Sequence, residues 1–352
     1  MKKLFLSLVA AVMCATASFA QGSLLATLSH DGEISVFYGS NALKTAVDAA
    51  ENGDVITLSS GQFNAVNITK NITLRGAGMS ISNDSINPHE MTIIQGAFSI
   101  NVADSLSGRI NMEGLYSGSN VTYNGTLRNA QFLKCRFQRF LAGTNAVMTN
   151  TSFIHCRFFD GVTLNANSNA VFINSIVCSP KSNQTSSTVE FDNCFVKYDY
   201  RSLYGGVYSQ NVVNAYYKNC IIQATSPADS NALPSSCTAI NCVGLGNYSG
   251  IFNYMAAKNS TNKFVNTISS VFKTYNATGS NTYINDSWSF ELTETAAQTY
   301  LGTDGTQVGV YGGNLPYSED PTIPQITKCN VASKSTADGK LSVDIEVKAA
   351  EY

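Results

Sequence analysis

Two neighbouring stretches of the chain carry charged side chains at matching positions. The set comprises Lys134, Arg136, Arg139, His155, Arg157 and Asp160. If the two stretches stack in register, Arg136 lies beside Arg157 with both side chains facing outward. Two such guanidinium groups suit the carboxylate or the acidic carbon of a uronate. All six except Arg139 are therefore candidate ligand-binding residues. The alternative is a solvated surface group with one weak salt bridge, from Arg139 to Asp160.

The segment KYDYRSLYGGVY, residues 197–208, combines four tyrosines with charged side chains. It lies in the longest of the well-matched repeats described below, which predicts a loop projecting from the scaffold, where binding sites tend to lie. Flat rings can stack on a sugar while charges bind its hydroxyls. The candidate binding residues are Tyr198, Tyr200, Arg201, Tyr204 and Tyr208. The alternative is a loop whose tyrosines fold back and pack against the scaffold.

The cysteines recur at one repeat position, as Cys135, Cys156, Cys194, Cys220 and Cys242. Parallel strands hold such Cβ atoms too far apart for a disulfide, and zinc needs convergent ligands rather than a line. We expect buried, unpaired thiols and no metal site. Cys178 and Cys329 lie elsewhere and are better candidates for a bridge. No nucleotide loop, Ser-His-Asp set or redox motif is present, so no cofactor is expected.

An internal repeat defines the scaffold that must position these residues. Six segments share one pattern: NAQFLKCRF, NTSFIHCRF, NAVFINSIV, TVEFDNCFV, NAYYKNCII and SCTAINCVG, which begin at Asn129, Asn150, Asn169, Thr188, Asn214 and Ser236. A period near 20 residues with alternating apolar positions is typical of the coils of a parallel β-helix. The aromatic fourth position extends more weakly to Leu58, Leu74, Ile94, Met112 and Phe264. The sequence therefore predicts an all-β, single-stranded right-handed parallel β-helix of about eleven coils.

Two further columns follow from this pattern. The sixth position reads Gly76, Gly96, Gly114, Lys134, His155, Asn174, Asn193, Asn219, Asn241 and Asn266. Gly and Asn tolerate a left-handed backbone, which predicts a bend at this position; Lys134 and His155 depart from the rule. The position after the cysteine reads Arg136, Arg157, Ile176, Phe195, Ile221 and Val243. This outward stripe becomes apolar and must be covered, either by the tail at 325–347 or by a second protein; we favour the tail.

Caps and processing segments complete the predicted organisation. Residues 24–37 read as a hairpin around Asp31-Gly32, and residues 40–52 as a short helix that ends before Gly53. Residues 316–352 contain a second hairpin around Asp338-Gly339. The predicted units are a signal peptide at 1–20, an N-terminal cap at 21–53, the β-helix at 54–315 and a C-terminal tail hairpin at 316–352.

The first residues predict export. Lys2 and Lys3 precede a short apolar stretch, and Ser18-Phe19-Ala20 suits signal-peptidase cleavage before Gln21. We expect secretion to the periplasm, the cell surface or the medium; a lipoprotein anchored through Cys14 is the disfavoured alternative. No other stretch is apolar for long enough to span a membrane. The formal charge of −2, with 13% charged residues, gives no indication of nucleic-acid binding.

Two longer segments carry a family resemblance. ALKTAVDAAENGDVITLSSGQF followed by KNITLRGAG, and later FELTETAAQTYLGTDGTQVGVYGG, resemble the opening and closing segments of secreted bacterial proteins of the pectate-lyase-like β-helix superfamily. With the repeats, the resemblance covers roughly residues 22–315. It implies the fold but no single activity, because that superfamily includes polysaccharide lyases, glycosidases and adhesins.

The catalytic patterns of that superfamily do not carry over to this chain. Polygalacturonase-like members use clustered aspartates with His-Gly and Arg-Ile-Lys segments, none of which occurs here. Pectate-lyase-like members use several calcium-binding aspartates, whereas acids on the coils here are sparse. We therefore expect a secreted or surface-associated glycan-binding protein without evident catalytic residues. The alternative is a polysaccharide lyase or glycoside hydrolase that acts on an acidic polysaccharide, and calcium would be expected only for a lyase.

Overall fold

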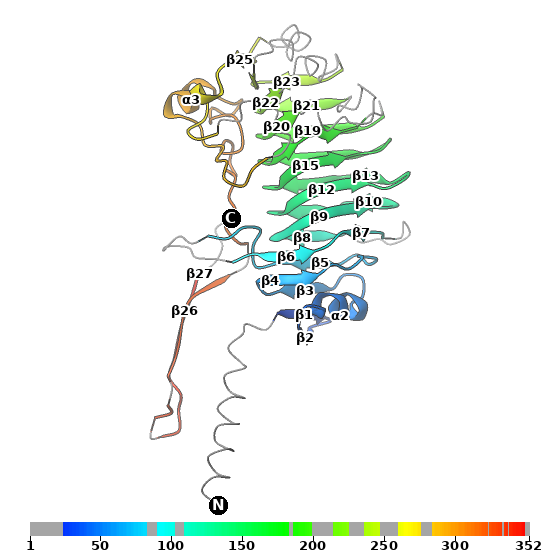
Figure 1. Ribbon diagram of the computed structural model, residues 1–352, viewed down its shortest axis with the longest axis vertical. Helices are drawn as coiled ribbons and strands as arrows, with labels where there is room; N and C mark the ends of the chain where they lie inside the picture. Colours follow the sequence, from blue (N-terminus) through cyan, green and yellow to red (C-terminus); the bar gives the residue numbers. More distant parts are fainter. Residues whose placement is uncertain are drawn as a thin grey trace, which may run out of the picture.

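Short strands separated by sharp bends follow the predicted repeat. The computed structural model describes residues 24–82, 90–102, 109–182, 186–198, 214–224, 236–246, 260–275, 284–322, 324–332, 334–336 and 338–348. The parallel strands stack into a β-solenoid, and this confirms the predicted class. It has about seven turns rather than eleven. Figure 1 shows the stack as a column with the N-terminal cap at its foot.

One wall of the solenoid is an eleven-stranded sheet. In spatial order its strands are β2 (Glu33–Tyr38), β1 (Leu25–His30), β3 (Val55–Leu58), β5 (Thr73–Arg75), β8 (Asn111–Glu113), β11 (Gln131–Leu133), β14 (Thr151–Ile154), β16 (Asn169–Ile173), β19 (Thr188–Asp192), β21 (Ala215–Lys218) and β23 (Thr238–Ile240). From β3 onward all pairs are parallel. We call this sheet the first wall.

The second wall is a twelve-stranded sheet. Its main path runs β25 (Lys263–Val265), β24 (Val243–Leu245), β22 (Ile221–Ala224), β20 (Phe195–Tyr198), β17 (Ile176–Cys178), β15 (Arg157–Thr163), β12 (Arg136–Ala142), β9 (Leu115–Tyr123), β6 (Thr92–Gln95) and β4 (Gly61–Asn64). Two short strands join it from the side, β18 (Pro180–Lys181) on β15 and β7 (Phe98–Ile100) on β9. A separate parallel pair, β10 (Thr126–Arg128) and β13 (Val147–Thr149), lies between the walls in two neighbouring turns.

The aromatic column forms the centre of the core. Successive rings of Phe132, Phe153, Phe172, Phe191 and Tyr217 stack face to face with centroids 4.8–5.0 Å apart. This spacing is that of adjacent strands, so identical positions in each repeat meet directly. All five side chains are fully buried. The repeat therefore builds its own core by stacking.

The weak outward extension of that column was wrong at three positions. Leu74 of the column pairs with Ile56, two residues before the expected Leu58. Ile94 lies in β6 and pairs with Phe63, and Phe264 pairs with Gly244, so both belong to the second wall. Between β5 and β8 the chain inserts β6 and β7 before it returns to the first wall. These misplacements account for part of the excess in the expected coil number.

The predicted bend between the walls occurs at the sixth repeat position. Left-handed φ angles of 42–63° are found at Gly114, Lys134, His155, Asn174, Asn193, Asn219 and Asn241. Gly96 instead follows β6 in the second wall, and Gly76 and Asn266 do not have the left-handed φ that was predicted for them. Lys134 and His155 adopt the bend although their side chains disfavour it, so something else must select them. We call Lys134, His155, Asn174, Asn193, Asn219 and Asn241 the corner column.

The cysteine column lies directly after this bend, and its thiols are buried and unpaired as predicted. Three of these sulfurs bond to the backbone of the previous turn. The thiols of Cys156, Cys194 and Cys220 donate to the carbonyl of the aromatic residue one turn earlier, at 3.2–3.3 Å, and Ser175 makes the same bond. Cys178 is a buried thiol with its sulfur 3.7 Å from the Ser179 hydroxyl. Cys178, one of the two candidates for a bridge, thus forms no disulfide, and the side chain of Cys329 lies outside the described residues.

The N-terminal cap agrees with its prediction. Strands β1 and β2 pair around Asp31 and Gly32, both with positive φ. Helix α2 (Ala42–Ala49) begins after Asn41 and buries Leu43 and Val47. Strand β1 also pairs antiparallel with β3, so the cap protects the first edge of the parallel stack.

The C-terminal part of the chain packs along the outer face of the second wall. It contains the 3-10 helix η5 (Ile268–Ser270), helix α3 (Glu294–Thr299) and extended backbone to residue 322. Its apolar side chains cover the stripe of Ile176, Phe195, Ile221 and Val243 in a second buried cluster. The cover is thus the chain itself, but it lies before the predicted tail. We call residues 284–322 the strap.

The tail hairpin does not cover the stripe. Strands β26 (Gln325–Val331) and β27 (Val343–Lys348) pair antiparallel and project away from the solenoid (Figure 1). Val343, Ile345 and Val347 on β27 are 51–59% exposed. The prediction that this segment docks on the stripe was therefore wrong.

Candidate functional site

The corner column holds the strap by hydrogen bonds. Lys134 Nζ donates to the Asp320 carbonyl at 2.8 Å and His155 Nε2 to that of Leu315 at 2.9 Å. Farther along the column, Asn174 Nδ2 donates to Val310 and Gly312, Asn219 to Thr303 and Asn241 to Leu301. The strap therefore runs antiparallel to the column over its length. Lys134 and His155 replace Asn where the strap needs longer donors.

The two stacked arginines are occupied by the same strap. Arg136 and Arg157 are register partners, as expected, but they are buried rather than facing solvent. Arg136 pairs with Asp286 and donates to the Met79 carbonyl; Arg157 Nη1 lies 3.3 Å from Glu319. Both guanidinium groups also lie over the ring of Phe159. These arginines are thus neither an open anion site nor a solvated surface pair.

The remaining members of the charged set have local partners. Arg139 forms a salt bridge with the buried Asp160 across the β12–β15 register shift. Burial lowers the pKa of Lys134 below its ordinary value, and Asp320 and Glu113 oppose this shift. Burial also lowers the pKa of His155, despite its bond to the Leu315 carbonyl. The structure thus brings Lys134, His155 and the arginines together, but beneath the strap.

The tyrosine segment is described only at its start. Tyr198 is buried, and its hydroxyl bonds to that of Tyr217 in the core. Burial raises the pKa of both hydroxyls. Tyr198 therefore packs inside the solenoid rather than stacking on a ligand. Tyr200, Arg201, Tyr204 and Tyr208 lie outside the described residues.

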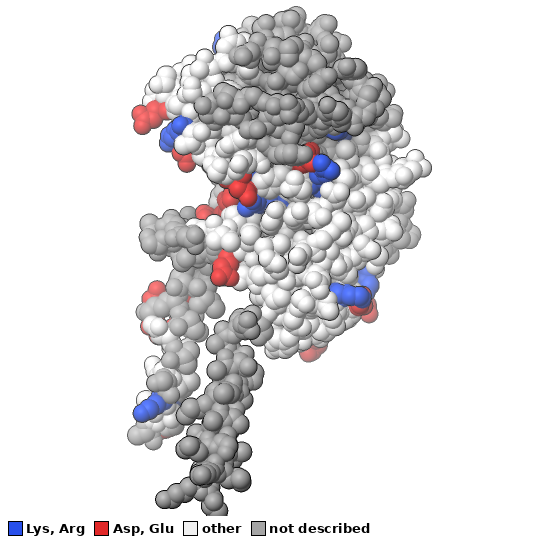
Figure 2. All heavy atoms as spheres, in the orientation of Figure 1, with Lys and Arg blue, Asp and Glu red and all other residues white. Residues whose placement is uncertain are grey.

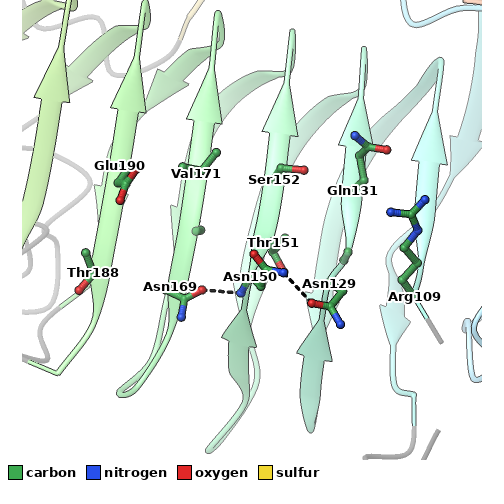
Figure 3. A pocket seen from close by; sticks show the side chains of 12 residues that line it. Arg109, Asn129, Gln131, Asn150, Thr151, Ser152, Asn169, Val171, Thr188 and Glu190 are labelled. Atoms are coloured by element: carbon green, nitrogen blue, oxygen red, sulfur yellow. Dashed lines mark hydrogen bonds between the residues drawn. The ribbon is translucent and has the colours of Figure 1, made fainter. Parts of the chain in front are cut away.

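A different surface offers an open polar groove. It has a volume of about 920 Å³ and lies on the outer face of the first wall, over β11, β14, β16 and β19. Its lining consists of Arg109, Asn129, Ala130, Gln131, Asn150, Thr151, Ser152, Asn169, Ala170, Val171, Thr188 and Glu190. We call this surface the wall groove, and Figure 3 shows it crossing successive strands.

An asparagine ladder borders the wall groove along one side. The side-chain Nδ2 of Asn150 donates to Asn129 Oδ1 at 2.7 Å, and the backbone N–H of Asn150 donates to Asn169 Oδ1 (Figure 3). Asn129 and Asn150 have left-handed φ angles of 51° and 49°, so they also form the turns that enter the strands. Their side chains are exposed. Amide groups left along this border can still bond to hydroxyls in the groove.

The floor of the wall groove is the third position of each repeat. The register aligns Gln131, Ser152, Val171 and Glu190 on neighbouring strands, with their side chains on the outer face. Tyr216 follows Glu190 in this row on β21 and is half-buried. An extended ligand running across the strands would therefore meet amide, hydroxyl, methyl, carboxylate and aromatic groups in turn.

Charge in the wall groove is confined to its ends, Arg109 at one and Glu190 at the other (Figure 3). The face seen in Figure 2 is likewise mostly uncharged, with basic and acidic side chains in small groups. Such a surface favours hydrogen bonding over attraction to one sign of charge. Among the described residues, no three His, Cys, Asp or Glu side chains are placed to hold a metal ion. In that part of the chain no helix has the length and apolar character needed to cross a membrane.

The wall groove has neither the clustered charges nor the aromatic side chains on which the predicted sites rested, so it was missed. Its signal was nonetheless present in the repeats. The first position reads Asn129, Asn150, Asn169, Thr188, Asn214 and Ser236, polar at every turn. Polar side chains at the same position of every turn form a continuous row on the outer face. Such a row plays no part in the core, so it could have been proposed as a binding surface.

The fold and this surface define the class of protein: a parallel β-helix with a polar groove across one wall, charged only at the two ends of its described lining. The chain matched no protein family, no curated protein and no solved structure in comparisons with each.

Proposed function

We propose that the protein binds a glycan chain along the wall groove. The observation that carries this proposal is the repetition of amide and hydroxyl side chains across four neighbouring strands, with one charge at each end. A polysaccharide repeats its hydroxyls along its length, as the groove repeats their partners along the stack. Secretion and a place among pectate-lyase-like proteins, both expected from the sequence, support this proposal.

Glycan binding without catalysis is favoured over glycan cleavage. A lyase or hydrolase needs acids and bases convergent on one bond. Among the described residues, Glu190 is the only acidic one that lines the wall groove, and Arg109 lies at its opposite end. The proposed role is therefore attachment to a polysaccharide or its retention.

Binding is tested by titrating the protein with soluble polysaccharides such as homogalacturonan, arabinan and xylan in a calorimeter. Gln131→Ala and Ser152→Trp are the groove variants, and each lies on the outer face. Loss of one hydrogen bond should weaken binding by about 2- to 12-fold, since such a bond contributes about 0.5–1.5 kcal/mol. The Ser152→Trp ring should block the floor and abolish binding.

The matched control is Gln62→Ala, which removes an exposed glutamine from β4 on the other wall. It should bind like the parent protein. Equal affinity of Ser152→Trp and parent would place the glycan elsewhere. Release of unsaturated sugars from the same polysaccharides, monitored by ultraviolet absorbance, would instead show a lyase.

A further inference from the structure

A second cavity lies where the strap crosses the second wall. It has a volume of about 270 Å³, just below the usual range for ligand pockets. Its lining consists of Arg157, Ile176, Asp286, Ser287, Trp288, Ser289, Phe290, Tyr311, Tyr317, Ser318 and Glu319. Only Arg157 and Ile176 come from the solenoid, so the strap builds most of this site. We call it the strap cavity.

Aromatic rings form one part of the strap cavity. Trp288, the only tryptophan of the chain, is half-buried there beside Tyr311. The indole is fixed by an edge contact with Tyr275 at 5.1 Å and by Lys197 Nζ, 5.4 Å from the ring centroid. Trp288 is thus held in place from behind while it remains accessible from the cavity. A fixed, partly exposed ring is a ready stacking surface.

Hydrogen-bonding groups form the other part. Arg157 is 5% exposed, and its Nε has no hydrogen-bond partner among the described residues. Glu319 accepts from the Tyr317 hydroxyl at 2.7 Å and from Arg157 at 3.3 Å, and its side chain is 29% exposed. Three serines complete the lining. An orphaned buried donor beside hydroxyls and a carboxylate indicates room for a polar ligand.

The charged side chains that line the cavity are each held in an ion pair. Arg157 is paired with Glu319, and Arg136 with Asp286. Burial alone would raise the pKa of Glu319. The Arg157 charge and the Tyr317 hydroxyl together lower this pKa by more than burial raises it, so the net shift is downward. Glu319 is therefore ionised at neutral pH and offsets the guanidinium charge. A charged ligand would have to break this balance, and an uncharged one would not.

We infer that the strap cavity binds a single uncharged sugar ring, stacked on Trp288 and hydrogen-bonded by Arg157, Glu319 and the serines. Cavity size restricts the ligand to about one ring. This site faces outward from the second wall, and the wall groove lies on the first. It does not depend on glycan binding in the wall groove.

The single tryptophan makes the test direct, since emission excited at 295 nm reports on residue 288 alone. The full chain is titrated with glucose, galactose, mannose, N-acetylglucosamine and galacturonate. At least one neutral sugar should give a saturable change, and galacturonate should bind no more tightly. Absence of any saturable change, or binding of galacturonate alone, would overturn the inference.

Variants separate binding from folding. Trp288→Ala should weaken binding measured by calorimetry about tenfold, as expected for the loss of a stacked ring, and Trp288→Phe should restore most of it. Ser318→Leu fills the cavity and should abolish binding even if Trp288→Ala proves unstable. Tyr38→Ala removes an exposed ring from the N-terminal cap and should change nothing. Unaltered affinity in Ser318→Leu would show that the sugar binds elsewhere, and Ser152→Trp should leave this site intact.

Discussion

Two guanidinium groups on adjacent strands would repel each other in an uncovered wall. Arg136 and Arg157 are register partners, about one strand spacing apart. The strap relieves this repulsion by placing a carboxylate on each, Asp286 on the first and Glu319 on the second. These two ion pairs therefore add an electrostatic contribution to the apolar packing that holds the strap on the wall.

Removing the charge of Glu319 tests this role. Glu319→Gln leaves the buried Arg157 without its carboxylate, so the free energy of unfolding should fall by about 2–4 kcal/mol in urea titrations. The control is Glu291→Gln, whose pair with Lys273 is 52% exposed on both sides and should contribute about 0–1 kcal/mol.

The pKa of Glu319 is lowered in the folded state. The pair's contribution is therefore present above the ordinary pKa of about 4.5 and is lost as pH falls through the lower folded value. A difference between variant and parent that persists unchanged at about pH 3 would contradict this account.

Residue identity alone predicted some contacts of this set and missed others. The match of Arg136 to Arg157 followed from the repeat, and so did the buried thiols. The burial of the two arginines did not follow from the repeat, because their partners Asp286 and Glu319 lie more than 120 residues away in segments without a repeat. Charge in a sequence indicates where an ion pair can form, but the second partner must be located by the fold.

At the scale of elements, one column of residues serves two purposes. The corner column bends the chain between the walls, and its side chains hold the strap. Asparagine suits both, since it tolerates a left-handed backbone and carries an amide donor. The sequence predicted the bend from this residue preference. It gave no indication of the second use, because the strap's acceptors, apart from the Thr303 hydroxyl, are backbone carbonyls that any residue supplies.

Asn174→Gly separates the two purposes. Glycine retains the left-handed conformation but loses the bonds to the Val310 and Gly312 carbonyls. We expect a loss of about 1–3 kcal/mol in the free energy of unfolding and faster amide exchange in residues 310–317. Asn145→Gly, at φ 57° in an exposed turn, should change stability by a few tenths of a kcal/mol. Equal effects of the two substitutions would mean that the amide bonds contribute nothing.

For the molecule as a whole, prediction succeeded where the chain repeats. The repeat positions between residues 129 and 242 were aligned correctly, because each turn can be compared with the turns on either side of it. Where the repeat weakened the alignment slipped, as at Leu58, Ile94 and Phe264. The strap has no repeat to compare, and its backbone follows the wall rather than a regular ladder. The exposed Val343, Ile345 and Val347 were then the most obvious cover for the apolar stripe, and the choice was wrong.

Two truncations distinguish the strap from the tail. A chain that ends at Thr322 loses only the hairpin, whose apolar side chains on β27 are exposed, so it should scatter light like the full chain and keep its melting temperature. A chain that ends before residue 267 uncovers Ile176, Phe195, Ile221 and Val243. Burial of each large side chain contributes about 1.5–3 kcal/mol, so this chain should lose at least about 6 kcal/mol and aggregate.

Phe290→Ala in the full chain is the milder form of the same test, and it should cost about 3–5 kcal/mol because that ring packs 4.4 Å from Phe195. Light scattering and thermal unfolding measure both effects. Aggregation of the chain ending at Thr322, with a fully stable Phe290→Ala protein, would return the covering role to the tail.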